Sequence, residues 1–210
     1  MRYISKLPEP REFTEWKAMK NEDWEPSYDK LINPEKSILV SSLIKEQGYL
    51  CCYCGISIDR GVCHIEHLKP QENYSTLRLE YSNMLASCNG VVTNQHCGQK
   101  KGNWYDEDKL VSPLNSSCES YFQFTSAGEI LHTDDRVKEQ AAKETILKLK
   151  LDHNMLIKRR KKALEGVLDD IDTLSSPDIQ KLIDSLYQPD GDGKLTQFCF
   201  VLQFVLKQYL

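Results

Sequence analysis

The hydrophobic positions near the N-terminus repeat with the period of an α-helix. Within residues 1–48 apolar side chains recur three or four positions apart, with a break at Pro26. Asn33 can cap a helix, Pro34 suits the first helical position, and Gly48 suits a helix end. We therefore predict two helices in this segment. Their apolar positions are Phe13, Trp16, Ile38, Leu39, Leu43 and Ile44.

Residues 113–210 predict a short β-hairpin followed by helices. Aromatic residues at 121, 122 and 124 precede a turn at 126–128 and then Ile130-Leu131. Helical spacing follows over about residues 134–149, about 153–170, and from Ser176 to the Pro189–Gly193 turn. A last helix at about 195–210 is apolar on most sides, so we expect it to be buried in the core or against a partner.

Between these parts, residues 49–112 show no clear hydrophobic periodicity and are rich in Cys, His, Gly and Asn. Such a stretch is typical of a small module that needs a metal because it cannot bury enough apolar area. The expected fold is therefore α+β, with an N-terminal helical segment (1–48), a metal-stapled module (49–112), and a hairpin plus helical region (113–210).

Composition narrows the class of protein. The 210 residues are 40% hydrophobic and 28% charged, which is ordinary for a globular chain. No apolar stretch is long enough to span a membrane, and the N-terminus lacks the apolar core of a signal peptide, so we expect a soluble cytoplasmic protein. The net charge of -4 argues against indiscriminate nucleic-acid binding.

Four of the eight cysteines form two pairs, and each pair is followed by a glycine. In a reducing cytosol grouped cysteines indicate metal binding rather than disulfides. Four thiolates suit a structural, tetrahedral Zn²⁺ site, with Gly55 and Gly98 allowing the backbone to turn beneath the sulfurs. The expected ligands are Cys51, Cys54, Cys88 and Cys97.

The second pair is unusual because eight residues, Asn89 to His96, separate its cysteines. His96 is therefore an alternative ligand that could replace one cysteine. The remaining cysteines are isolated, and we expect them to be small buried residues. These are Cys52, Cys63, Cys118 and Cys199.

Between the cysteine pairs lies His64-Ile65-Glu66-His67, which reads as a strand. Strand alternation places His64 and Glu66 on one face, and Lys69-Pro70 ends the strand with His67 at its tip, where it can reach solvent. A carboxylate suits a hard cation such as Mg²⁺, and a neutral imidazole suits a general base. Downstream, Asn83 could tie the His67 backbone in place.

Two basic segments are candidates for phosphate contact. Residues 98–104 read as the polar start of a helix that carries Lys100 and Lys101, and a helix N-terminus with lysines suits phosphate. The strongest basic run is 158–162, for which a solvated helix face is favoured over a nucleic-acid contact.

The order of these motifs resembles the HNH (His-Me finger) endonucleases, which have a ββα-metal fold. The resemblance rests on C-x-x-C at 51–54, Glu-His-Leu-x-Pro at 66–70, Ser-Asn-x-Leu at 82–85 and Cys-Gly-x-x-Lys-Gly-Asn at 97–103. The residues within these motifs are similar to those of the PtuB-type proteins of Septu and retron-associated anti-phage systems, which act beside an ATPase called PtuA. It covers roughly residues 49–105.

The resemblance implies a role for each matching residue. His67 would be the general base, Glu66 the acid that binds a catalytic Mg²⁺ or Mn²⁺, and His64 would lie beside the metal. Asn83 would orient the base. The chain departs from the pattern at Gly98, where the family often has a metal-binding Asn or His. Candidates for the second metal ligand are His64, Asn89, Gln99 and Asn103.

We therefore expect a metal-dependent HNH endonuclease acting on DNA, with RNA left open, in a hetero-oligomeric complex with a PtuA-type ATPase. Lys100, Lys101 and Asn103 are the expected substrate contacts. One alternative is a non-catalytic zinc module that binds nucleic acid or protein. Another is a homing or restriction-type HNH enzyme that acts without the ATPase. A zinc scaffold alone has no need of Glu66 and His67 together.

Overall fold

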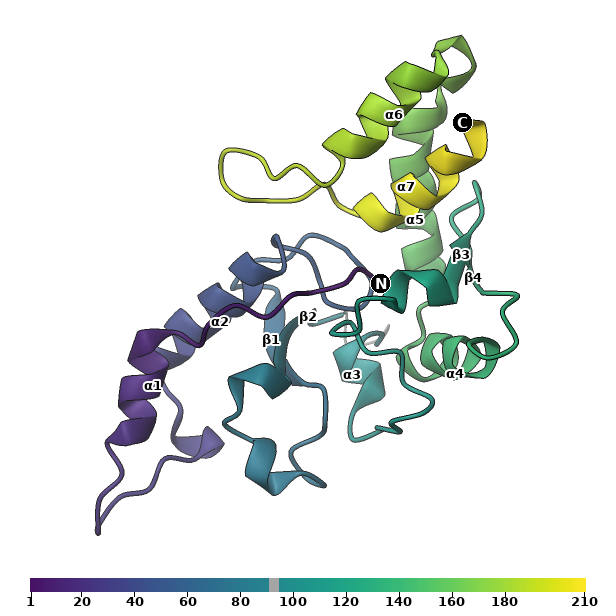
Figure 1. Ribbon diagram of the computed structural model, residues 1–210. Helices are drawn as coiled ribbons and strands as arrows, with labels where there is room; N and C mark the ends of the chain where they lie inside the picture. The colour runs from purple at the N-terminus through teal and green to yellow at the C-terminus, as the bar shows by residue number, and fades with distance from the viewer. Residues whose placement is uncertain (91–94) are drawn as a thin grey trace.

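The computed structural model describes residues 1–90 and 95–210. Part of the Asn89–His96 spacer, residues 91–94, therefore lies outside the described residues. In the described part of the chain the strands form two small antiparallel sheets, the first against the N-terminal pair of helices and the second against the C-terminal helices (Figure 1). The predicted mixture of helices and small sheets is confirmed.

The N-terminal segment contains two helices, as predicted, but they are shorter than the segment. α1 spans Arg11–Ala18 and α2 spans Glu35–Glu46, with a 3₁₀ turn at Tyr28–Lys30 between them. Pro34, not Asn33, occupies the cap position of α2, and no side chain caps this end. Gly48 has a φ of +63°, the left-handed conformation expected where a helix stops.

The central segment contains an antiparallel strand pair. β1 (Cys63–His67) pairs with β2 (Met84–Cys88), with Ile65 opposite Ala86. β2 is buried along its whole length because α2 covers it. The buried side chain of Gln47 joins the two elements, since it donates to the Ala86 carbonyl and accepts from the Ala86 amide, at 2.8 and 2.7 Å. A four-residue helix, α3 (Gly98–Lys101), follows β2.

The C-terminal segment begins with the predicted hairpin. β3 (Phe122–Phe124) pairs with β4 (Ile130–His132). The helices are α4 (Glu139–Leu149), α5 (Asn154–Leu168), α6 (Ser176–Ser185) and α7 (Cys199–Leu206). α4 starts later than the apolar pattern predicted. Val137, which the pattern placed inside the helix, lies before its first turn and is 91% exposed.

The last helix, α7, packs against α5, α6 and β3, so its apolar surface is covered within the chain. It begins at Cys199 rather than near 195 because the preceding backbone bonds to the end of the N-terminal segment and to the central segment. The amides of Leu195 and Phe198 donate to the carbonyls of Gly48 and Gly55, each at 3.0 Å. These bonds attach the C-terminal helices to the cysteine-rich part of the chain.

Arg160 lies in the basic run 158–162 but is only 2% exposed. Its guanidinium donates to the carbonyls of Gly128 and Leu151, at 2.7 and 3.1 Å. Burial lowers the pKa of Arg160 to about 10, and the sulfurs of Cys54 and Cys97 oppose that shift. Arg160 therefore joins the hairpin turn to α5 and is no part of a solvated face, whereas Lys158, Arg159 and Lys162 are exposed.

We expect Arg160→Met to lower the free energy of unfolding by about 2–4 kcal/mol, because it leaves two buried carbonyls without a donor. The measurement is urea denaturation. Lys162→Met on the same helix is the control and should change stability by less than about 0.5 kcal/mol. Equal effects of the two substitutions would show that Arg160 has no special structural role.

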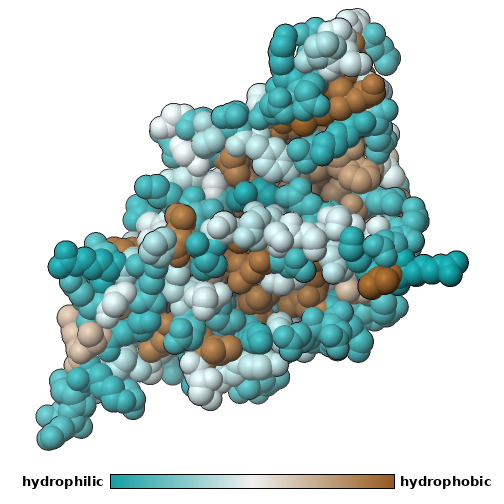
Figure 2. Space-filling model, in the orientation of Figure 1, coloured by the Kyte–Doolittle hydropathy of each residue, from teal (hydrophilic) through white to brown (hydrophobic). Residues whose placement is uncertain are grey.

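The surface shown in Figure 2 is mostly hydrophilic, and its hydrophobic side chains form separate patches, one of them over the helical arm that contains α6 and α7. Among residues 1–90 and 95–210, no helix combines the length and the apolar character needed to cross a bilayer.

Candidate functional site

Four cysteine thiols meet in the interior of the central segment. Cys51 and Cys54 come from the loop before β1, Cys88 ends β2, and Cys97 precedes α3. Their sulfurs lie within 4.8 Å of one another, all four residues are buried, and none is in a disulfide. The Cys54 and Cys88 sulfurs are 3.9 Å apart, close to the edge of about 3.8 Å of a tetrahedron with Zn–S bonds of about 2.3 Å. The predicted cluster is confirmed, and its donors fit Zn²⁺.

His96 contacts this cluster from the side. Its Nδ1 atom is 3.1 Å from the Cys97 sulfur and 3.7 Å from the Cys88 sulfur. The four cysteines converge without it, so the alternative of His96 as a ligand is not needed. Of the isolated cysteines, Cys52, Cys118 and Cys199 are buried as predicted, whereas Cys63 is only half-buried. Burial raises the pKa of each of these thiols, to about 11 for Cys63, Cys118 and Cys199, which keeps them neutral.

The glycines behind the two cysteine pairs differ in role. Gly55 has a φ of +78°, as its predicted place in the turn requires. In the second pair the residue with a positive φ is Cys97, at 57°, so the turn beneath the sulfurs is made there and not, as predicted, at Gly98. Gly98 provides space instead. A Cβ atom there would lie 2.7 Å from His64 Nε2 and closer still to Glu66 Oε2.

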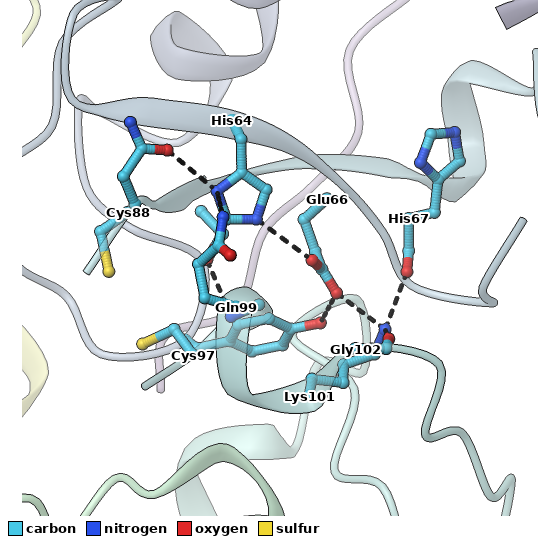
Figure 3. A network of polar contacts seen from close by, with 12 residues as sticks. His64, Glu66, His67, Cys88, Cys97, Gln99, Lys101 and Gly102 are labelled. Carbon is cyan, nitrogen blue, oxygen red and sulfur yellow. Dashed lines mark hydrogen bonds and ion pairs between the residues drawn. The ribbon is translucent and has the colours of Figure 1, made fainter. Parts of the chain in front are cut away.

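A polar network connects β1 with α3 (Figure 3). His64 and Glu66 project from the same face of β1, as predicted, with His64 Nε2 3.5 Å from Glu66 Oε2. The other carboxylate oxygen, Oε1, accepts from the Tyr53 hydroxyl at 3.0 Å and pairs with Lys101 Nζ at 2.8 Å. Burial would raise the pKa of Glu66, but His64 and Lys101 outweigh it and keep that pKa below its ordinary value.

The outer nitrogen of His64 is oriented by neighbouring amides. His64 Nδ1 is 3.2 Å from Asn89 Oδ1 and 3.5 Å from Gln99 Nε2. Without a cation, an N–H at Nε2 faces Glu66 Oε2; with a cation bound, Nδ1–H would donate to Asn89 Oδ1 and free the Nε2 lone pair for the metal. A histidine that ligates a metal commonly donates its other N–H in this way. Of the candidates for a second ligand, His64 is the one aligned with Glu66.

His67 lies at the end of β1, as predicted, but it is only 6% exposed. The prediction that its side chain extends into solvent is therefore wrong. In Figure 3 its ring points away from the Glu66 carboxylate. His67 Nε2 must carry a hydrogen because it donates to the Arg78 carbonyl at 3.0 Å, which leaves Nδ1 with its lone pair. The Tyr28 and His67 rings pack edge to face, with 4.8 Å between their centroids. Burial lowers the pKa of His67, so the imidazole is neutral at neutral pH.

Asn83 fixes the loop after His67 rather than His67 itself. Its side-chain Nδ2 donates to the Lys69 carbonyl at 3.0 Å, and its Oδ1 accepts from the Lys69 backbone N–H at 2.8 Å. The His67 carbonyl is held by Lys101 Nζ, at 3.0 Å. The predicted link from Asn83 to the His67 backbone is therefore indirect.

The three expected substrate contacts have different surroundings. Lys100 is exposed. The Lys101 side chain is 1% exposed and its ammonium is committed to Glu66 and the His67 carbonyl. The Asn103 side chain lines the same hollow as His64, and its amide donates to Glu72. Only Lys100 presents a free charge at the surface among these three.

His64, Glu66 and His67 line one hollow of about 260 Å³ together with residues of α3 and the loop that follows it. Two donor atoms, His64 Nε2 and Glu66 Oε2, meet beside the space left by Gly98. A nitrogen and a carboxylate oxygen suit a divalent cation such as Mg²⁺ or Mn²⁺. The hollow therefore combines a place for a cation with one end of His67, whose ring points away from the Glu66 carboxylate.

Comparison with known proteins gives one informative match. No family model matches the chain. Over 133 residues the chain is 34% identical to a curated protein of Escherichia coli named "Retron Ec83 putative HNH endonuclease". The match covers 58% of this chain and 45% of the relative, so the chain spans less than half the length of the relative it matches. This similarity supports a nuclease of the class that the motif order resembles.

Proposed function

We propose that the protein is a metal-dependent HNH endonuclease that hydrolyses phosphodiester bonds in DNA, with β1, β2 and α3 forming its ββα-metal unit. One observation carries the proposal. His64 Nε2 and Glu66 Oε2 converge next to the space that Gly98 leaves, and His67, the residue after Glu66, contributes to the lining of the same hollow. The name of the Escherichia coli relative supports the same class.

In this proposal each residue has a distinct task. His64 and Glu66 would hold Mg²⁺ or Mn²⁺, which would supply positive charge to offset the negative charge on the phosphate oxygens. His67 Nδ1 accepts the proton of the attacking water, since Nε2 is already bonded to the Arg78 carbonyl. Lys101 fixes Glu66 and the end of β1 together through its contacts with both. The four cysteines would hold a structural Zn²⁺, away from the substrate.

We also propose that the nuclease acts in anti-phage defence within a complex of the PtuB and PtuA kind. The relative's name places that protein with a retron. A chain with a net charge of -4 attracts DNA weakly by itself, so a partner ATPase would supply part of the surface that holds the substrate.

The alternative of a non-catalytic zinc module explains less of the structure. A buried ion pair such as Glu66–Lys101 gives little net stability, because desolvation offsets the attraction. A zinc scaffold gains nothing from this pair, whereas a cation site needs an ionised carboxylate held in one orientation. The network around Glu66 therefore favours catalysis.

We expect Gly98→Ala to weaken Mn²⁺ binding at least about tenfold and to reduce DNA cleavage, because the new methyl group occupies the space between the two ligands. Isothermal titration with Mn²⁺ and a plasmid-nicking assay measure the two effects. The backbone at Gly98 accepts alanine without strain, so the zinc content should stay unchanged.

The matched control is Gly166→Ala on α5, where an added Cβ meets nothing within 4 Å. This variant should bind Mn²⁺ and cut DNA like the wild type. Unchanged Mn²⁺ affinity in Gly98→Ala would place the cation elsewhere, and a wild-type protein that neither binds Mn²⁺ nor cuts would refute the proposed function.

A further inference from the structure

A second, larger hollow lies between α2 and β1. Its volume is about 500 Å³, within the range of about 300–1,000 Å³ that is typical of ligand sites. α2 contributes Lys36, Ser37 and Val40 to its wall, and β1 contributes Cys63, His64 and Ile65. It shares His64 and Ile65 with the hollow that contains Glu66. The two hollows therefore meet along β1.

Two exposed cations face this larger hollow. Lys36 and Arg60 both line it, and within the described part of the chain neither has a carboxylate oxygen within 4.0 Å. Arg60 donates to the Ser37 hydroxyl at 3.2 Å, which directs the guanidinium toward α2. The neighbouring carboxylate of Asp59 accepts instead from the Gly61 amide, at 2.7 Å. Two unpaired cations and a hydroxyl form a surface that suits a phosphate group.

This larger hollow lies beside both parts of the candidate site, the proposed base His67 and the proposed cation ligands His64 and Glu66. Tyr28 forms part of its wall, and the same ring packs edge-on against His67, at 4.8 Å between centroids. His64 lines the hollow from β1 and faces Glu66 with its Nε2 atom. A group bound between Lys36 and Arg60 would thus lie beside the proposed cation ligand and beside the ring that packs on the proposed base.

We propose that this hollow binds the phosphate of a nucleotide that flanks the scissile bond of the DNA, with Lys36 and Arg60 as its phosphate contacts. The inference rests on the proposed function and adds a substrate contact that the N-terminal segment supplies. The active hollow itself offers few free cations, since Lys101 is committed to Glu66. The flanking contact compensates for this and aligns the strand across His64.

The test is DNA binding by fluorescence anisotropy, with a labelled oligonucleotide and Mg²⁺, in a His67→Ala background so that no strand is cut. Lys36→Ala and Arg60→Ala should each weaken binding by about tenfold, the loss typical of one charge-assisted contact. Each should also reduce the slope of log K against log salt concentration by about 0.7–0.9. Both side chains are exposed, so thermal unfolding should be unchanged.

The matched control is Lys45→Ala, which removes an exposed lysine at the opposite end of α2. It should leave the affinity within twofold of its background and the salt slope unchanged. If the wild type cuts DNA but Lys36→Ala and Arg60→Ala bind like Lys45→Ala, the flanking contact is wrong and the proposed function stands. If the wild type neither binds nor cuts DNA, alone or with the co-expressed ATPase, the proposed function fails and the flanking contact fails with it.

Discussion

Replacing Cys51 with serine is expected to abolish stoichiometric zinc binding and to lower the midpoint of thermal unfolding by about 10 °C or more. The physical reason is that three separate parts of the central segment converge at these four sulfurs. Cys51 and Cys54 precede β1, Cys88 ends β2, and Cys97 begins the turn into α3. Without the metal, buried thiolates would repel one another and the loops would lose their shared anchor.

The size of this effect follows from the energy of zinc sites. Structural Zn²⁺ contributes about 10–16 kcal/mol to the folding of zinc-finger peptides. Here the apolar core around α2, β2 and α7 persists, so only part of such a contribution is lost. A loss of about 4 kcal/mol corresponds to roughly 8–16 °C in a chain of this length.

Cys118→Ser is the matched control because Cys118 is equally buried but lies outside the cluster. It should retain one equivalent of zinc, whatever its cost in packing. Zinc content by metal analysis and unfolding by calorimetry give the two readouts. A Cys51→Ser protein that retains zinc and melts like the wild type would contradict the structural-zinc assignment.

Replacing His67 with alanine is expected to slow DNA cleavage by about 10²–10⁴-fold, the usual contribution of a general base. The fold should survive, because His67 lies at the end of β1 and its ring bonds, among the described residues, only to the carbonyl of Arg78, an exposed turn residue. The Glu66–Lys101 pair and the cysteine cluster do not depend on the ring. The loss should therefore appear in the rate under single-turnover conditions, with zinc content unchanged.

His132→Ala provides the matched control for the loss of an imidazole. His132 lies on β4, outside the central segment, and takes no part in the network around Glu66. It should cut DNA at the wild-type rate. Equal slowing in both variants would point to a general loss of stability instead of the loss of a base.

The sequence predicts the parts of the site that depend on local spacing. The paired cysteines predict the cluster, and strand alternation places His64 and Glu66 on one face. The role of Lys101 could not be predicted in this way, since a lysine in the first turn of a polar helix is normally exposed. Its burial arises from packing against Glu66, 35 positions earlier in the chain, which no local pattern encodes.

Element boundaries show the same limit. The apolar pattern predicts a helix from about 195, yet α7 begins at Cys199 because the amides of Leu195 and Phe198 bond to Gly48 and Gly55. Likewise Arg160 looks like one member of a solvated basic run, although its guanidinium is buried against the hairpin turn. In each case a tertiary contact decides what the local sequence leaves open.

The most direct test of the central claim compares wild type and His67→Ala on supercoiled plasmid DNA, in EDTA and then with Mg²⁺ or Mn²⁺ restored, with and without the co-expressed ATPase. The account predicts cleavage by the wild type only when the cation is present, and a loss of that cleavage in a folded, zinc-loaded His67→Ala protein. Cleavage at equal rates by both proteins, or none by either under all of these conditions, would contradict it.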